Sequence, residues 1–194
     1  MSEPAKKEAV YEDLYDLPEN MTGEIIDGEL IVTPRPAPKH VYTTSVLDKK
    51  IGSPYQFGES GGPGGWIILV EPEIKFAEEC NPIVPDLAGW KAERFPKAIE
   101  TNWISVAPDW VCEMLSPRTR KYDRMKKMPK YARFEVQYAW LIDPSNRTLE
   151  VFQLRQGEWV VTGFYEEDDK VRAEPFTEIE IDLSSLWLEK RVTT

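Results

Sequence analysis

The sequence predicts an α/β (α+β) protein with a mixed central sheet flanked by helices. A helical segment precedes three strand-like apolar runs, a second helical segment separates the third run from a fourth, and further alternating runs follow. The 194 residues, 41% of them hydrophobic, suit one globular domain. No run of about 18 apolar residues is present, so we expect no membrane span.

The N-terminal region predicts a helix followed by a hairpin. Residues 5–17 have the pattern of a short amphipathic helix that stops before Pro18. The segment GEIIDGELIVTP, 23–34, contains two alternating runs around Asp27-Gly28, a pair that favours a two-residue type I′ turn. This region carries no apolar signal-peptide core, so a cytoplasmic protein is expected.

A longer helix is expected over roughly 39–51, with its end near Gly52 and Pro54. Its inward-facing residues should be Val41, Val46 and Leu47. Cys80 and Cys112 make no disulfide framework, and each is expected to be a small buried or half-buried residue.

The strand-like runs that follow cover 66–76, 83–90 and 108–115. We expect them to form a continuous antiparallel meander, because consecutive strands are usually neighbours. A basic helical segment, about 119–134, precedes the run 137–144. A strand reached through a helix crossover lies parallel to the strand before it, so 137–143 should join the sheet in parallel.

The C-terminal part predicts a hairpin turning at Gln156-Gly157 and then an alternating segment that closes with an apolar anchor. The whole chain is thus expected to be a single domain. Its parts are an N-terminal helix and hairpin arm (1–36), a core (37–144) and C-terminal strands (145–194).

Two acidic residues interrupt apolar runs: Asp86 in IVPDLAGW and Glu113 in DWVCEMLSP. A buried carboxylate costs several kcal/mol unless a cation or a metal compensates it. On neighbouring strands the two carboxylates would repel each other and attract a divalent cation. Near a divalent metal, such a pair together with a lysine from the basic helix is a constellation for phosphodiester hydrolysis. The alternative is that Glu113 simply pairs with a buried lysine or arginine.

Charge is unevenly distributed along the chain. The net charge is −10, which argues against indiscriminate binding to nucleic acid. Residues 118–133 nevertheless hold eight of the 24 basic residues and only one acid, Asp123. We call this segment the basic strip. It is either a surface that faces nucleic acid or a solvated helix face.

Several motifs occur in a characteristic order: EIIDGELIVTPRPAPKH at 24–40, VPD at 84–86, EMLSPRT at 113–119 and YDRMKKMPKYARFEVQYAWLIDP at 122–144. In these motifs the chain resembles the Uma-two (Uma2) family of restriction-endonuclease-like proteins, within the PD-(D/E)XK nuclease superfamily. The resemblance implies a restriction-endonuclease-like core. It also implies an endonuclease that depends on Mg²⁺ or Mn²⁺ and hydrolyses phosphodiester bonds of nucleic acid, with DNA the expected form. A homodimer is one arrangement left open.

The resemblance also implies roles for particular residues. Asp86 matches the acid of the PD motif and Glu113 the second acid, with the backbone carbonyl of Met114 as a third metal ligand. The superfamily's lysine position, two residues after Glu113, holds Leu115. The Uma-two pattern instead places the lysine in the following helix, where Lys127 stands.

Lys127 is spaced four residues from both Asp123 and Tyr131, so the three should share a helix face, whereas Lys126 and Lys130 are competing lysines. Residues expected to support the site are His40, Glu71, Glu73, Asp123 and Tyr131. Residues expected to face nucleic acid are Arg118, Arg120 and Lys121. The rival interpretation is a non-catalytic interaction or scaffold protein of the same fold with a vestigial site.

Overall fold

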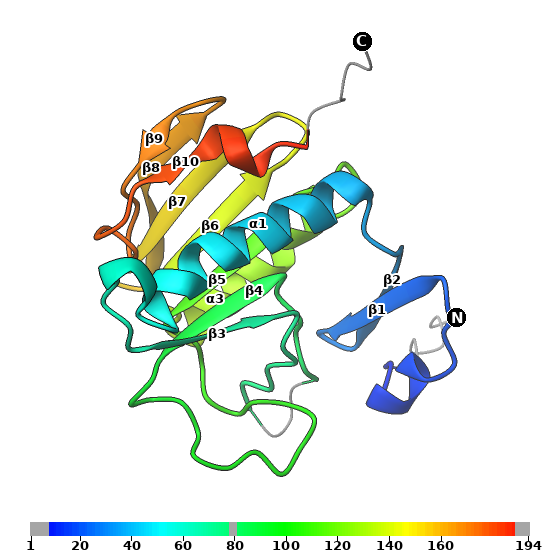
Figure 1. Ribbon diagram of the computed structural model, residues 1–194. Helices are drawn as coiled ribbons and strands as arrows, with labels where there is room; N and C mark the ends of the chain where they lie inside the picture. Colours follow the sequence, from blue (N-terminus) through cyan, green and yellow to red (C-terminus); the bar gives the residue numbers. More distant parts are fainter. Residues whose placement is uncertain (1–7, 78–80, 189–194) are drawn as a thin grey trace, which may run out of the picture.

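The computed structural model describes residues 8–77 and 81–188, and its centre is a six-stranded mixed sheet (Figure 1). The strand order is β3-β4-β5-β6-β7-β8. The strands are β3 (Trp66–Val70), β4 (Leu87–Lys91), β5 (Trp110–Met114), β6 (Tyr138–Asp143), β7 (Thr148–Arg155) and β8 (Glu158–Glu166). Neighbours are antiparallel except β5 and β6, which are parallel. The predicted meander and the parallel fourth strand are confirmed.

Helices cover both faces of this sheet. Helix α1 (Pro38–Tyr55) lies across one face, and α3 (Met128–Arg133) lies behind the other (Figure 1). Between β5 and α3 the chain forms one turn, α2 (Arg120–Tyr122), and a π-helical segment, η3 (Asp123–Lys127). The predicted mixed sheet between helices is therefore confirmed.

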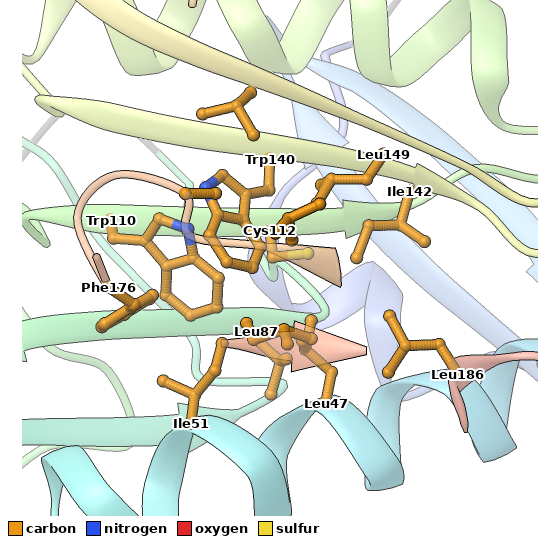
Figure 2. Packing of buried hydrophobic residues seen from close by; sticks show 14 of the residues in the cluster. Leu47, Ile51, Leu87, Trp110, Cys112, Trp140, Ile142, Leu149, Phe176 and Leu186 are labelled. Atoms are coloured by element: carbon orange, nitrogen blue, oxygen red, sulfur yellow. The ribbon is translucent and has the colours of Figure 1, made fainter. Parts of the chain in front are cut away.

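The α1 face holds the larger apolar cluster, shown in Figure 2. Leu47 and Ile51 of α1 pack there against the sheet and are fully buried. The rings of Trp110 and Trp140 meet edge to face, with their centroids 5.4 Å apart, and Phe176 packs 4.9 Å from Trp110. Such aromatic pairs add to the stabilisation that burial itself provides.

Alternation along β5 decides which side chains face which helix. Trp110 and Cys112 belong to the cluster under α1, whereas Val111 belongs to the cluster that contains Met128 of α3. Successive side chains of a strand point to opposite faces. Glu113 therefore lies on the α3 side, two residues from Val111.

Helix α1 is longer than its sequence predicts. It runs through Gly52 and Pro54 to Tyr55, because Leu47, Ile51 and Tyr55 form one buried stripe whose packing outweighs the local breakers. Pro54 lies in the last turn, where it removes a single helical hydrogen bond. The prediction that Val41 faces inward is wrong, since its side chain is 51% exposed.

The predicted N-terminal hairpin is present as β1 (Met21–Ile26) and β2 (Glu29–Pro34). Asp27 and Gly28 join the strands with φ of 53° and 73°, as a type I′ turn requires. The predicted helix over 5–17 is wrong over its described part. Only a 3₁₀ turn, η1 (Tyr11–Leu14), forms there, and residues 5–7 lie outside the described residues.

The meander strands are shorter than predicted, since β3 stops at Val70 and β4 begins only at Leu87. The turn at Gln156-Gly157 joins β7 to β8 as expected, with φ of 53° and 81°. The remaining short elements are η2 (Glu59–Gly61), β9 (Lys170–Val171), β10 (Ile181–Asp182) and η4 (Leu183–Leu186).

The C-terminal alternating segment thus contributes only β10 and η4, although Leu183 and Leu186 are buried in the α1 cluster as the apolar anchor.

Cys112 is buried and free, while Cys80 lies outside the described residues. No helix among residues 8–77 and 81–188 is long and apolar enough to cross a membrane.

Candidate active site

Asp86 and Glu113 lie next to each other in the sheet. Leu87 of β4 pairs with Cys112 of β5, so Asp86, which precedes β4, stands beside Glu113. Both line a cleft of about 720 Å³ whose opposite wall is the N-terminal arm. The meander thus brings together two acids that are 27 residues apart in the chain.

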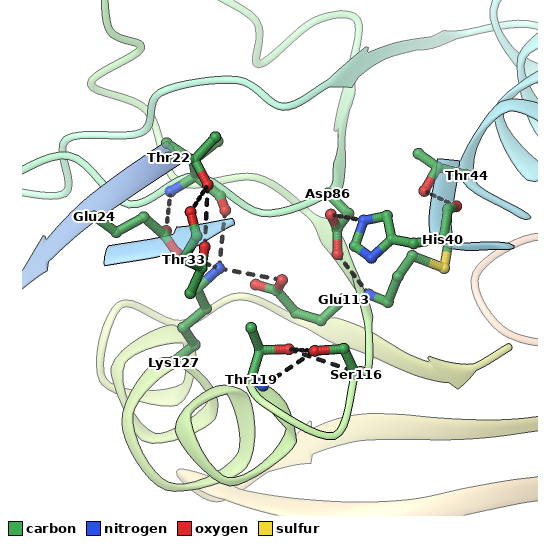
Figure 3. A network of polar contacts seen from close by, with 12 residues as sticks. Thr22, Glu24, Thr33, His40, Thr44, Asp86, Glu113, Ser116, Thr119 and Lys127 are labelled. Carbon is green, nitrogen blue, oxygen red and sulfur yellow. Dashed lines mark hydrogen bonds and ion pairs between the residues drawn. The ribbon is translucent and has the colours of Figure 1, made fainter. Parts of the chain in front are cut away.

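Glu113 is buried, and each of its two carboxylate oxygens contacts one donor of the protein. Its Oε1 accepts a hydrogen bond of 2.6 Å from the hydroxyl of Tyr131, and its Oε2 lies 3.2 Å from the ammonium of Lys127. The Lys127 side chain is only 4% exposed and that of Glu113 only 3%. The basic helix therefore supplies the buried cation that a buried carboxylate needs. Figure 3 shows Lys127 directed at Glu113 from that helix.

The π-helical segment explains how Lys127 reaches this position. Pro129 cannot donate a backbone hydrogen bond and would clash with the carbonyl four residues earlier in a regular helix. The chain widens to a π-helix over Asp123–Lys127 just before this proline, a feature that often marks functional sites. Asp123, Lys127 and Tyr131 are all buried on one face, as their spacing predicts.

The two competing lysines point elsewhere. Lys126 is exposed. Lys130 binds Asp27 at the tip of the hairpin, with 2.9 Å between Nζ and Oδ1. Of these three lysines, Lys127 alone contacts Glu113.

Asp86 is held from two sides (Figure 3). Its Oδ1 lies 2.6 Å from Nε2 of His40, which belongs to the first turn of α1. Its Oδ2 accepts a hydrogen bond of 2.6 Å from the backbone N–H of Met114. The acid, the histidine and the strand that carries Glu113 are thus linked directly.

The cleft carries more acid than base, and this affects its titration. Burial raises the pKa of Glu113 well above its usual value, although the Lys127 ammonium opposes the shift. Burial likewise raises the pKa of Asp123 to about 6. For Lys127, burial opposes the charged form, but the Glu113 and Glu24 carboxylates outweigh it and raise the pKa. Lys127 therefore stays charged among several acids.

His40 titrates under the same influences. Burial disfavours its charged form, but the hydrogen bond and the negative charge of Asp86 outweigh burial, so the pKa of the imidazole is raised.

Of the other predicted supporting residues, Glu71 and Glu73 line the cleft. Glu73 accepts a hydrogen bond of 2.7 Å from the hydroxyl of Tyr11, so it also ties η1 to the core.

The basic strip is less available than its charge count suggests. Arg120 binds Asp143, with 2.5 Å between Nη2 and Oδ2, and Arg124 binds Glu150. Together with Lys127 and Lys130, four of the eight basic side chains are therefore paired with acids. Arg118, which lines the cleft, and Lys121 are exposed.

One acid in the cleft was not predicted from the sequence. Glu24 of β1 contacts Lys127, with 3.0 Å between Oε2 and Nζ. The signal lay in the strand alternation: Glu24 stands two residues before Ile26, which is buried in the cluster with Tyr131. Residues two apart share a face of a strand, so Glu24 must point toward the core.

The donor set suits a hard divalent cation. Asp86 and Glu113 supply carboxylate oxygens, and each oxygen keeps a second lone pair beyond the hydrogen bond it accepts. Within residues 8–77 and 81–188, no three His, Cys, Asp or Glu side chains gather so that they could hold a metal ion together. Mg²⁺ commonly takes one or two carboxylates and several waters, so two acids in an open cleft fit it.

The mixed sheet with helices on both faces has the architecture of a restriction-endonuclease-like nuclease fold. Residues 11–184 match the sequence profile of the Uma2 family, described as "Putative restriction endonuclease", and the chain belongs to this family. It is similar to a crystal structure described as "a putative nuclease belonging to DUF820" from Anabaena variabilis. The two share 26% identity and a TM-score of 0.71, over 91% of this chain and 96% of that one. No curated protein matches the sequence.

Proposed function

We propose that the protein is an endonuclease that depends on Mg²⁺ or Mn²⁺ and hydrolyses phosphodiester bonds of DNA. One observation carries the proposal. Asp86, Glu113 and Lys127 come from three separate segments and meet in one cleft, on a sheet of the nuclease type. Family membership supports the nuclease class, and the buried lysine supplies the cation missing at Leu115.

In this proposal Asp86 and Glu113 hold the divalent cation, with the carbonyl of Met114 as a further ligand and waters completing its shell. When bound, the cation supplies positive charge to the phosphate that undergoes attack. Lys127, beside Glu113, supplies positive charge that stabilises the negative charge developing on the phosphate. Tyr131 keeps Glu113 oriented through its 2.6 Å hydrogen bond.

His40 and the strip residues take supporting roles. His40 orients Asp86 by contacting Oδ1, which leaves the other carboxylate oxygen directed at β5. Arg118 and Lys121 are assigned contacts with DNA phosphates, and their exposure supports this role. Arg120 is the weaker candidate of the predicted trio, because Asp143 already neutralises it.

A non-catalytic nuclease-fold binding protein is the second candidate, and a specific observation favours it. All four carboxylate oxygens of Asp86 and Glu113 already accept hydrogen bonds or ion pairs from the protein. In a vestigial site that binds no metal, donors of the protein itself would satisfy the carboxylate oxygens in this way.

Metal binding and nicking separate the two candidates. Isothermal titration with Mg²⁺ and Mn²⁺ should show binding by the wild type and none by the double variant Asp86→Asn, Glu113→Gln. Plasmid nicking should be lost in the same variant and retained in Lys126→Ala, whose side chain is exposed. Absence of divalent binding at millimolar metal would overturn the catalytic proposal in favour of the binding protein.

A further inference from the structure

Glu24 reaches the site from outside the sheet. It lies in β1 of the hairpin, yet its carboxylate makes two contacts with the core (Figure 3). Oε1 accepts a hydrogen bond of 2.8 Å from the backbone N–H of Val84, and Oε2 lies 3.0 Å from the Lys127 ammonium. The Glu24 side chain is 21% exposed, so it stands at the border between the cleft and the interior.

These contacts complete the surroundings of Lys127. An ammonium group has three N–H donors. In the structure it donates hydrogen bonds to the carbonyl of Val84 at 2.9 Å and to Oε2 of Glu113 at 3.2 Å, and it forms an ion pair with Oε2 of Glu24 at 3.0 Å. Of the two carboxylates, the one from the hairpin is the nearer. The Lys127 ammonium is therefore shared between the Glu24 and Glu113 carboxylates and is not paired with Glu113 alone.

Glu24 also fixes the segment that carries Asp86. The Val84 residue is held through both of its backbone polar groups, because its N–H donates to Glu24 and its carbonyl accepts from Lys127. Asp86 follows two residues later. A single hairpin side chain thus sets the position of the ammonium relative to Glu113 and supports the approach to the other acid.

A purely structural role in docking the hairpin does not account for this geometry. The tip of the hairpin has its own ion pair, between Asp27 and Lys130, and Asp27 is 62% exposed there. Tyr11 provides a further link, to Glu73. Docking the arm therefore does not require a carboxylate aimed at Lys127.

We propose that Glu24 is a positioning residue of the cleft, which keeps Lys127 between the hairpin and Glu113 so that Glu113 remains available to a cation. The proposal rests on the endonuclease function proposed above. Glu24 and Glu113 are the two carboxylates that contact Lys127 here. If Glu24 were neutral, Lys127 would pair with the Glu113 carboxylate alone and would compete with the cation for it.

The test uses Glu24→Gln, whose amide oxygen still accepts the Val84 hydrogen bond, and Asp27→Asn as the matched hairpin control. The first readout is the ¹⁵N resonance of the Lys127 ammonium, assigned with Lys127→Arg and recorded without metal or DNA. Glu24→Gln should shift or broaden this signal, and Asp27→Asn should leave it unchanged. An unchanged Lys127 signal in Glu24→Gln would overturn the proposal.

The second readout is nicking kinetics with Mg²⁺. Glu24→Gln should lower kcat by on the order of 10²-fold with KM nearly constant, as expected for a misplaced catalytic group. Glu24→Asp should restore part of the loss, whereas equal kcat for Glu24→Gln and wild type would contradict the positioning role. If the wild type does not nick DNA but its Lys127 signal depends on Glu24, the endonuclease proposal fails and the positioning of Lys127 stands.

Discussion

Replacing Lys127 by methionine should destabilise the fold substantially, because the Glu113 and Glu24 carboxylates lose their cation. Methionine keeps most of the side-chain volume, so the change tests the charge and not the packing. Lys127 is 3% exposed, and its ammonium has Glu113 and Glu24 within 3.2 Å. Removing one partner of a buried ion pair costs about 3–5 kcal/mol, since the other charge stays buried without compensation. For a chain of this size each kcal/mol lowers Tm by about 2–4 °C, so Tm should fall by roughly 6–20 °C.

The measurement is thermal unfolding near pH 7.5, followed by circular dichroism. Lys126→Met is the matched control, and it should change stability by about 0.5 kcal/mol or less because Lys126 is exposed. The double variant Lys127→Met, Glu113→Gln should regain part of the loss, since the unpaired charge is then absent. A Tm for Lys127→Met within 2 °C of the wild type would refute the buried ion pair.

The same variant should depend on pH in a defined direction. The Lys127 ammonium opposes the burial that raises the pKa of Glu113, so without Lys127 that pKa rises further. Glu113 can then take up a proton as the pH falls, which removes the uncompensated charge. The Tm difference between Lys127→Met and wild type should therefore shrink in acid, and a difference that grows in acid would contradict the assignment.

The other predictions concern Asp123 and the basic strip. The pKa of Asp123 rises from 3.8 to about 6 on folding, so this carboxyl lowers stability progressively as the pH increases through that interval. Asp123→Asn should thus gain up to roughly 3 kcal/mol in urea unfolding at about pH 7.5 and nothing below about pH 4, and a gain confined to acid would refute the reasoning. Neutralising Arg118 and Lys121 should flatten the salt dependence of DNA affinity by about 0.9 for each phosphate that is no longer neutralised, whereas an unchanged slope would make them solvated surface. Arg120→Gln should instead lower Tm, because it leaves buried Asp143 without its arginine.

The sequence by itself determined most of the scaffold. Local chemistry was sufficient for the hairpin turn, since Asp27-Gly28 tolerates the positive φ that a type I′ turn needs. Strand order and the helix crossover were sufficient for the meander and its parallel fourth strand, because few connections of such elements are possible. The spacing of Asp123, Lys127 and Tyr131 also predicted that they share a helix face, and the structure adds that all three are buried.

Local signals failed where packing across the chain outweighed them. The helix predicted to stop near Gly52 continues to Tyr55, because its buried stripe is extended by contact with the sheet. The expected N-terminal helix is reduced to the 3₁₀ turn η1 in the described part, although its residues have the amphipathic pattern. Short helices are marginal without a packed apolar face, and η1 has no buried residue.

Only the tertiary structure decided how the charges of the cleft are distributed. The family resemblance singled out Lys127 in a run of lysines, but no pattern in the sequence shows that this lysine is buried or which acids it contacts. Lys127 was distinguished from Lys130 because the helix and the hairpin meet, so that Lys130 reaches Asp27 while Lys127 lies between Glu24 and Glu113. The physical reason is that pairing and burial here depend on a hairpin and a helix that lie far apart in the sequence, and no local pattern records their distance in space.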